Sequence, residues 1–317
     1  MERWLVTGAA GFLGSHVIEQ LVKMKKKVFA IDNLSWGHKD FLNQYEGQLD
    51  FYKTDLRDKG ALDQALKIIQ PTHVVHLAAL HFIPLAIKNP SLAVDINVRG
   101  TQNLLQSLRE NTSYKTFWFA STGDVYAPSE APHHETESEI APFNIYGLTK
   151  LMGEQLIKLE SKNCSDKAFI IGRLFNLYGA RETNPHILPE ILGQIKAQTG
   201  EVRLSLGNVW PKRDMVPIDE AATCIIESLE KVIQQKAGWY CMNYATGKAI
   251  SMEEMIKALA KILGRPIHIE IDQNKVRGVE RAHLEAHVKG LQTFIGKSPS
   301  SDLESGLKKL LKSENLI

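Results

Sequence analysis

The sequence has few cysteines, and what it lacks already narrows the class of protein. Only three cysteines occur in 317 residues, at Cys164, Cys224 and Cys241. The count is odd, and the spacings match no metal-binding pattern, so we expect no metal site. Sparse, unpaired cysteines favour a reducing compartment, and the expected location is the cytoplasm.

Long hydrophobic runs and a strong charge of one sign are also missing. No apolar run approaches the roughly 20 residues that span a bilayer, and Trp4 begins a strand where a signal peptide would place its charged segment. The formal net charge is +2, which is too small to indicate a nucleic-acid partner. With 44% hydrophobic and 23% charged residues, the chain is expected to be globular, without membrane or nucleic-acid partners.

Short apolar strands alternate with helical segments along the first 175 residues. Continuous apolar strands between helices predict a parallel sheet covered on both faces, the doubly wound (Rossmann) α/β fold. The expected strands are 4–6, 28–32, 50–53, 73–78, 116–120 and 168–173, and the expected helices are 15–23, 59–69, 91–109 and 144–160.

The pattern changes after about residue 176, where turns and polar residues increase. Residues 207–217 are predicted to be a loop, 218–232 and 251–263 helices, and 266–271 a half-buried strand. We therefore expect a dinucleotide-binding domain over 1–176. Residues 177–317 should form mainly a smaller C-terminal α/β substrate lobe, interleaved with the first domain, with the active site in the cleft between them.

Three glycines, Gly8, Gly11 and Gly14, lie between the first expected strand and helix. Glycine lets backbone N–H groups and a helix N-terminus approach a pyrophosphate. A structural turn would explain the glycines alone, but Asp32 ends the next strand eighteen residues after Gly14, as a dinucleotide fingerprint requires. The Asp32 carboxylate favours NAD over NADP, because it accepts ribose hydroxyls and repels a 2′-phosphate.

Tyr146 and Lys150 lie four residues apart on an expected helix and therefore face the same way. For tyrosine to act as a base near neutral pH, its pKa must fall by roughly 3 units, which corresponds to about 4 kcal/mol. A neighbouring ammonium and a positively charged nicotinamide would both attract the tyrosinate anion and so lower the pKa of the tyrosine. Tyr-x-x-x-Lys occurs by chance in many helices, but after a dinucleotide fingerprint it predicts hydride chemistry on a nicotinamide cofactor.

A series of short motifs runs in order along nearly the whole chain. The motifs are 7–14, Asp32-Asn33-Leu34, Asp55-Leu56-Arg57-Asp58, His76-Leu77-Ala78-Ala79, Asn97-Val98-Arg99-Gly100-Thr101, Ser121-Thr122-Gly123-Asp124-Val125-Tyr126, Tyr146-Gly147-Leu148-Thr149-Lys150, 173–179 and Arg213-Asp214. In these motifs the chain resembles the extended short-chain dehydrogenase/reductase family, and within it the nucleotide-sugar epimerase/dehydratase branch.

This resemblance assigns roles to matching positions. Tyr146 would take a proton from a sugar hydroxyl, Lys150 would hold the nicotinamide ribose, and Thr122 would hydrogen-bond the reacting oxygen. Without the resemblance, helix capping would explain the hydroxyls of Ser121 and Thr122. The residues implied to bind NAD are Gly8, Ala10, Gly11, Phe12, Leu13, Gly14, Asp32, Asn33, Asp55, Leu56, Leu77, Ala78, Ala79, Asn97, Tyr146, Lys150 and Phe175.

A nucleotide-diphosphate sugar, with UDP-sugar favoured, is the implied substrate. Arginine matches phosphate by two-pronged hydrogen bonding, which suits Arg213 and Arg281. Arg277 competes for the role of Arg281. An exposed arginine is usually only a solvated charge, and this interpretation stays open for both Arg213 and Arg281. Each of the other positions has a plainer interpretation, which is a structural histidine for His81, a satisfied helix amide for Asn97 and a loop or cap carboxylate for Asp55. The implied substrate contacts are His81, Ser121, Thr122, Asn176, Arg213 and Arg281.

The residue at Gly123 bears on the reaction. Family 4,6-dehydratases usually carry Thr-Asp-Glu where this chain has Thr122-Gly123-Asp124. The aspartic acid of that motif is therefore missing at Gly123, and the Asp124 side chain is one carbon shorter than the glutamate. We therefore expect a 4-epimerase. Asp124 could still act as a catalytic acid or base, so a 4,6- or 5,6-dehydratase or a sugar-acid decarboxylase remains an alternative. A non-catalytic dinucleotide sensor is disfavoured, because such relatives typically lack the tyrosine or the lysine that this chain retains. His287 stands where aspartate is common, which puts the C-terminal substrate contacts in doubt. The family also implies a homodimer built on helices that include 144–160.

Overall fold

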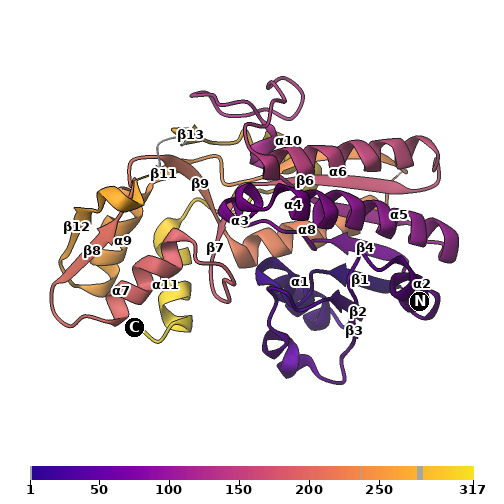
Figure 1. Cartoon of the computed structure of the whole chain (residues 1–317), viewed down its shortest axis with the longest axis horizontal. Helices are drawn as coiled ribbons and strands as arrows, with labels where there is room; N and C mark the ends of the chain where they lie inside the picture. The colour runs from indigo at the N-terminus through magenta and orange to yellow at the C-terminus, as the bar shows by residue number, and fades with distance from the viewer. Residues whose placement is uncertain (1, 236, 277–280) are drawn as a thin grey trace.

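A seven-stranded parallel sheet forms the centre of the computed structural model, which describes residues 2–235, 237–276 and 281–317 (Figure 1). The strand order is β10-β6-β5-β4-β1-β2-β3, and every neighbouring pair is parallel. The order reverses between β1 and β4, the point at which doubly wound sheets bind ligands. The strands are β1 (Arg3–Thr7), β2 (Lys27–Asp32), β3 (Leu49–Lys53), β4 (His73–His76), β5 (Thr116–Thr122), β6 (Ala168–Leu174) and β10 (Gly238–Tyr244).

Helices cover both faces of this sheet, as the continuous apolar strands predict. On one face α1 (Phe12–Lys23) and α8 (Ile218–Ile233) share a core cluster, and α10 (Lys289–Ile295) packs beside α8. The other face carries α2 (Lys59–Ile69), α5 (Gly100–Asn111) and α6 (Ile145–Lys162), which bury leucine and isoleucine side chains against the sheet. Two short helices, α3 (Ile83–Lys88) and α4 (Pro90–Val94), lie next to α6.

A smaller lobe lies at the C-terminal end of the chain (Figure 1). Its core is the parallel pair β8 (Val202–Leu206) and β12 (Ile267–Ile271), packed with α7 (Ile187–Lys196), α9 (Met252–Leu263) and α11 (Leu303–Ser313). A second sheet joins the lobe to the main body through β7 (Asn176–Tyr178), β9 (Lys212–Pro217), β11 (Ala249–Ser251) and β13 (His283–Leu284). Because β10 and α8 belong to the main body, the chain crosses back after residue 176. The domain division at that residue stays a prediction.

Most predicted elements are confirmed, including α2 and α9, and α9 begins with a capping box of Ser251 and Glu254. The loop predicted over 207–217 is wrong in its second half, because Lys212–Pro217 forms β9. This strand is stabilised by three partners distant in sequence, β7, β11 and β13, and no local pattern reveals such pairing. The single helix predicted over 91–109 is interrupted by a π turn at Asp95–Arg99.

No helix in the described parts of the chain has both the length and the apolar character that a membrane crossing requires.

Candidate active site

A cavity of about 1790 Å³ opens at the carboxyl ends of the central strands and extends to the smaller lobe. It brings together nearly all of the residues that the sequence predicts for cofactor, substrate and catalysis. The exceptions are Ala10 and Asn97, which do not line it. The predicted residues that do line it are Gly8, Gly11, Phe12, Leu13, Gly14, Asp32, Asn33, Asp55, Leu56, Leu77, Ala78, Ala79, His81, Ser121, Thr122, Asp124, Tyr146, Lys150, Phe175, Asn176, Arg213 and Arg281.

The glycine turn between β1 and α1 has no room for side chains. Gly8 has a φ of +69°, and a Cβ at Gly14 would lie 2.0 Å from the Gly8 carbonyl oxygen. No side chain caps the N-terminus of α1, where Gly11 is the N-cap residue, and the first residues of the helix, Phe12 to Gly14, line the cavity. A bare helix N-terminus beside a tight glycine turn fits the pyrophosphate of a dinucleotide.

Two carboxylates lie at the same end of the sheet, Asp32 as the last residue of β2 and Asp55 just after β3. Asp32 accepts hydrogen bonds from the backbone N–H of Ala10 (3.0 Å) and of Leu34 (2.8 Å), and burial raises its pKa. Ala10 therefore contributes by orienting Asp32. Asp55 accepts from Asn33 (2.8 Å) and pairs with Arg57 (2.7 Å), and the hydrogen bonds from Arg57 hold the Asp55 pKa well below its usual range.

Tyr146 and Lys150 lie on the first two turns of α6, facing the cavity. Asn144 caps this helix by accepting from the Gly147 N–H at 2.8 Å. The Lys150 Nζ lies 6.0 Å from the Tyr146 ring centre and 5.0 Å from that of Phe119. Burial lowers the Lys150 pKa to about 7.

The Tyr146 phenol differs from the expectation of a lowered pKa. Burial raises its pKa, the Asp124 charge adds to the rise, and hydrogen bonding with Thr122 opposes it. A buried amine with a pKa near 7 carries only part of a positive charge at neutral pH, so the protein alone does not supply the attraction that an active tyrosinate requires.

Asp124 and Arg281 meet at the turn that follows β5. Burial raises the pKa of Asp124, while the charges of Arg281 and Arg213 oppose that rise. Arg281 is only 5% exposed, and its guanidinium donates to the backbone carbonyls of Gly123 and Tyr126. Arg281 thus holds this turn from within, whereas the sequence suggested either a diphosphate contact or a solvated charge. Arg277, its competitor, lies outside the described residues.

Other predicted residues connect neighbouring loops. The Asn97 amide is fully used by both backbone groups of Leu80 and by the Thr149 hydroxyl. His81 lines the cavity, and its Nε2 contacts Asn184 at 3.0 Å. Both residues fix the loop after β4, which is the plainer interpretation of each. Arg213 lies on β9 and not in a loop.

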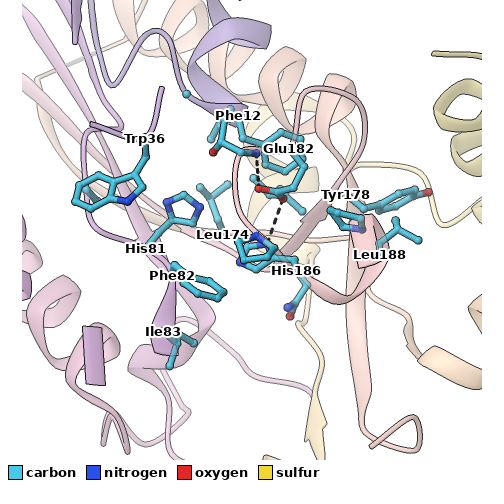
Figure 2. Close-up of a pocket in the computed structure, with 18 of the residues that line it drawn as sticks. Phe12, Trp36, His81, Phe82, Ile83, Leu174, Tyr178, Glu182, His186 and Leu188 are labelled. Atoms are coloured by element: carbon cyan, nitrogen blue, oxygen red, sulfur yellow. Dashed lines mark hydrogen bonds and ion pairs between the residues drawn. The ribbon is translucent and has the colours of Figure 1, made fainter. Parts of the chain in front are cut away.

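Several cavity residues were not predicted. Figure 2 shows four of them, Trp36, Phe82, Glu182 and His186, among the residues that line the cavity. Glu182 and His186 contact one another at 3.2 Å. The sequence offers one clue to these unpredicted residues, which is that they come after strands that end at the same edge of the sheet. The remaining unpredicted lining residues that the figure labels are Ile83, Leu174, Tyr178 and Leu188.

Comparison with known proteins identifies the family. Residues 4–239 match the model of the NAD dependent epimerase/dehydratase family. The chain is 30% identical over 318 residues to the UDP-glucose 4-epimerase of Halalkalibacterium halodurans, covering 93% of this chain and 90% of that protein. It is 31% identical to UDP-glucose 4-epimerase 1 of Oryza sativa subsp. japonica, covering 83% and 81%.

A solved structure extends this comparison to the fold. The UDP-N-acetylglucosamine 4-epimerase of Methanobrevibacter ruminantium, in complex with UDP-N-acetylmuramic acid, superposes with a TM-score of 0.85 at 26% identity, covering 99% of this chain and 98% of that one. The glycine turn, the acidic residue that ends β2 and the Tyr-x-x-x-Lys pair all line the cavity. The chain therefore belongs to the NAD-dependent epimerase/dehydratase family, with NAD as its cofactor.

Proposed function

We propose that the protein is a nucleotide-sugar 4-epimerase, with a UDP-sugar as its substrate. The observation that carries this proposal is the presence of Tyr146, Thr122 and Lys150 together in the cavity, with glycine at position 123, where dehydratases carry a carboxyl group. A 4-epimerase needs one group that removes and returns the same hydroxyl proton. The curated relatives named above are UDP-glucose 4-epimerases, which supports the choice of nucleotide.

In the proposed reaction, Tyr146 takes the proton of the sugar 4-hydroxyl and later returns it. Thr122 holds the reacting oxygen against the phenol, and Lys150 holds the ribose beside it. NAD, when bound, supplies a reversible hydride acceptor and the positive charge that lowers the pKa of Tyr146. Rotation of the 4-keto sugar between the two hydride transfers inverts the configuration at C4.

The space around Gly123 argues against standard dehydration. A Cβ at this position would lie 3.2 Å from the Phe175 ring and 3.4 Å from a methyl group of Leu284. A side chain here would require the Phe175 ring to shift by a few tenths of an ångström, and the carboxyl group that dehydratases carry at this position would need more room than a Cβ alone. The second candidate, elimination or decarboxylation, depends on Asp124, whose pKa is raised by burial in the same cavity.

Proton NMR in heavy water with UDP-glucose, UDP-galactose and their N-acetyl and uronic acid analogues tests this proposal. We expect a C4 epimer that retains its C5 proton. A 4-keto-6-deoxy product with deuterium at C5, or release of carbon dioxide, would assign the reaction to Asp124. Tyr146→Phe should reduce kcat by roughly 10²- to 10⁴-fold. Tyr52→Phe, on β3 outside the cavity lining, is the matched control.

We also propose that the protein is a homodimer formed through α6. Leu148, Met152 and Leu159 are 44%, 40% and 58% exposed and form one stripe on this helix, opposite its buried face. Val94, which is 37% exposed, is a further exposed apolar side chain on α4, a helix that packs next to α6. A self-complementary helical face of this kind suits a two-fold interface.

Light scattering on Met152→Asp should show a monomer where the unaltered protein is a dimer. Ile68→Asp is the control, because Ile68 is 64% exposed but lies on α2, away from the stripe. A dimer that survives Met152→Asp would place the interface elsewhere.

A cytoplasmic location is the last part of the proposal. Cys164, Cys224 and Cys241 are free thiols, and Cys164 and Cys224 are buried. Free thiols persist where glutathione and thioredoxin keep them reduced. Fractionation of cells that express the tagged protein tests this location.

A further inference from the structure

The inward face of α6 carries a third ionisable residue beyond Tyr146 and Lys150. Glu154 follows Lys150 by four residues, and each of the two is only 3% exposed. Residues at this spacing are neighbours on a helix, and a lysine and a glutamate so placed ordinarily form an ion pair. In a buried site the attraction between them is stronger than on a surface. A Lys150–Glu154 pair would occupy the amine that the reaction requires.

The structure places other partners on the Glu154 carboxylate instead. Arg173, on β6, donates from Nε to Oε1 at 3.0 Å and from Nη2 to Oε2 at 2.8 Å. Ser121 Oγ donates to Oε1 at 2.5 Å. Both carboxylate oxygens are therefore used, and the two-pronged guanidinium contact fixes the direction of the side chain.

Arg173 is itself held from behind. Its Nη1 donates to the Tyr126 hydroxyl at 3.0 Å, and its guanidinium lies 4.8 Å from the centre of the Tyr126 ring. The Tyr126 hydroxyl in turn donates to Asn243 Oδ1 at 2.7 Å. Arg173 is 6% exposed, so water does not compete for these bonds. The arginine therefore has one well-defined position, directed at Glu154.

Lys150 is left with aromatic contacts. Within the described ranges, no carboxylate forms an ion pair with its amine, and its ring neighbours are Phe119 and Tyr146. Burial is the cause that lowers its pKa, with no opposing contribution from a carboxylate. A lysine four residues before a buried glutamate on a helix would be expected to pair with it if no other cation held that glutamate.

We propose that Arg173 is a positioning residue that binds Glu154 and so prevents it from pairing with Lys150, leaving the lysine amine for Tyr146 and the cofactor ribose. The inference rests on the role proposed above for Lys150. It adds Arg173 and Glu154, which touch neither the substrate nor the cofactor in this scheme, to the residues on which the reaction depends.

The test measures the titration of Lys150 directly. Reductive methylation with ¹³C-formaldehyde labels the lysines, and the Lys150 signal is the one missing from Lys150→Met. In Arg173→Gln, Glu154 turns to Lys150, and the Lys150 pKa should rise from about 7 to about 8 or higher. Calorimetry should show NAD binding weakened about tenfold, since the lysine hydrogen bond to the ribose is lost.

The double variant Glu154→Gln/Arg173→Gln separates this role from simple structural support. It removes both charges, so Lys150 should titrate as in the unaltered protein and NAD affinity should recover. Arg109→Gln is the matched control, because Arg109 pairs at 2.7 Å with another buried glutamate of α6, Glu160, farther along the helix. It should leave the Lys150 titration unchanged.

Two results would overturn the proposal. One is a Lys150 pKa that does not change in Arg173→Gln, and the other is a double variant impaired as much as the single one. If thermal melting shows that Arg173→Gln does not fold, Arg173→Lys replaces it, because a single ammonium cannot hold both oxygens and the Lys150 pKa should still rise. The titration needs no substrate, so it remains decisive even if the proposed epimerase activity is absent.

Discussion

The variant Lys150→Met should have a higher unfolding free energy than the unaltered protein at low pH. This difference in unfolding free energy should shrink as the pH rises. The folded protein holds the Lys150 pKa at about 7, whereas an unfolded chain has the ordinary value of 10.5. The difference between the two values corresponds to about 5 kcal/mol, the upper limit of what burying this ammonium costs below pH 7. Methionine fills a similar volume without a charge and removes this penalty.

The sign follows from proton binding. Between pH 7 and 10.5 the unfolded chain retains the Lys150 proton and the folded protein releases it, so the stability of the unaltered protein rises with pH in this range. Below pH 7 both states are protonated and the penalty is constant. From pH 6.5 to pH 9 the difference in unfolding free energy between Lys150→Met and the unaltered protein should therefore shrink by about 2 to 3 kcal/mol.

Urea unfolding followed by circular dichroism at pH 6.5, 7, 8 and 9 measures this difference. Lys158→Met, an exposed lysine on the same helix, is the control and should show a difference that does not vary with pH. If the curve for Lys150→Met is equally flat, the amine remains protonated in the folded protein. Burial would then not set its charge, and the reasoning about both Lys150 and Tyr146 would fail.

Two further predictions concern the cofactor end of the cavity. Gly14→Ala should lower the unfolding free energy by about 1 to 3 kcal/mol and weaken NAD binding at least about tenfold, because its Cβ would lie 2.0 Å from the Gly8 oxygen. Gly60→Ala is the control, because a Cβ at Gly60 would lie 3.6 Å from the nearest atom, and it should be neutral or stabilise the fold by about 0.5 to 1 kcal/mol. If Gly14→Ala and Gly60→Ala change the unfolding free energy in denaturation and the NAD affinity in calorimetry by equal amounts, the steric argument is refuted. Asp32→Asn should reduce the preference for NAD over NADP about tenfold or more, since a repelling charge is removed. Fluorescence titration of both dinucleotides checks the ratio, and an unchanged ratio would mean that another group excludes the phosphate.

Local sequence patterns determined much of the fold. The apolar runs that became the central strands, the glycine turn around Gly14 and the capping box at Ser251 are patterns of neighbouring residues that can be recognised in the sequence, and the structure contains all of them. Tyr146 and Lys150 belong to the same class, since a spacing of four residues on a helix fixes their common direction.

The tertiary structure decided what depends on contacts between distant segments. β9 forms because three remote strands pair with it, and Glu182 and His186 join the cavity because their loop crosses the carboxyl end of the sheet. The partner of Glu154 is Arg173 rather than its helical neighbour Lys150, and the pKa of Tyr146 is raised rather than lowered. Ion-pair choice and desolvation are set by the groups that packing brings within a few ångströms, and residue spacing along the chain does not contain that information.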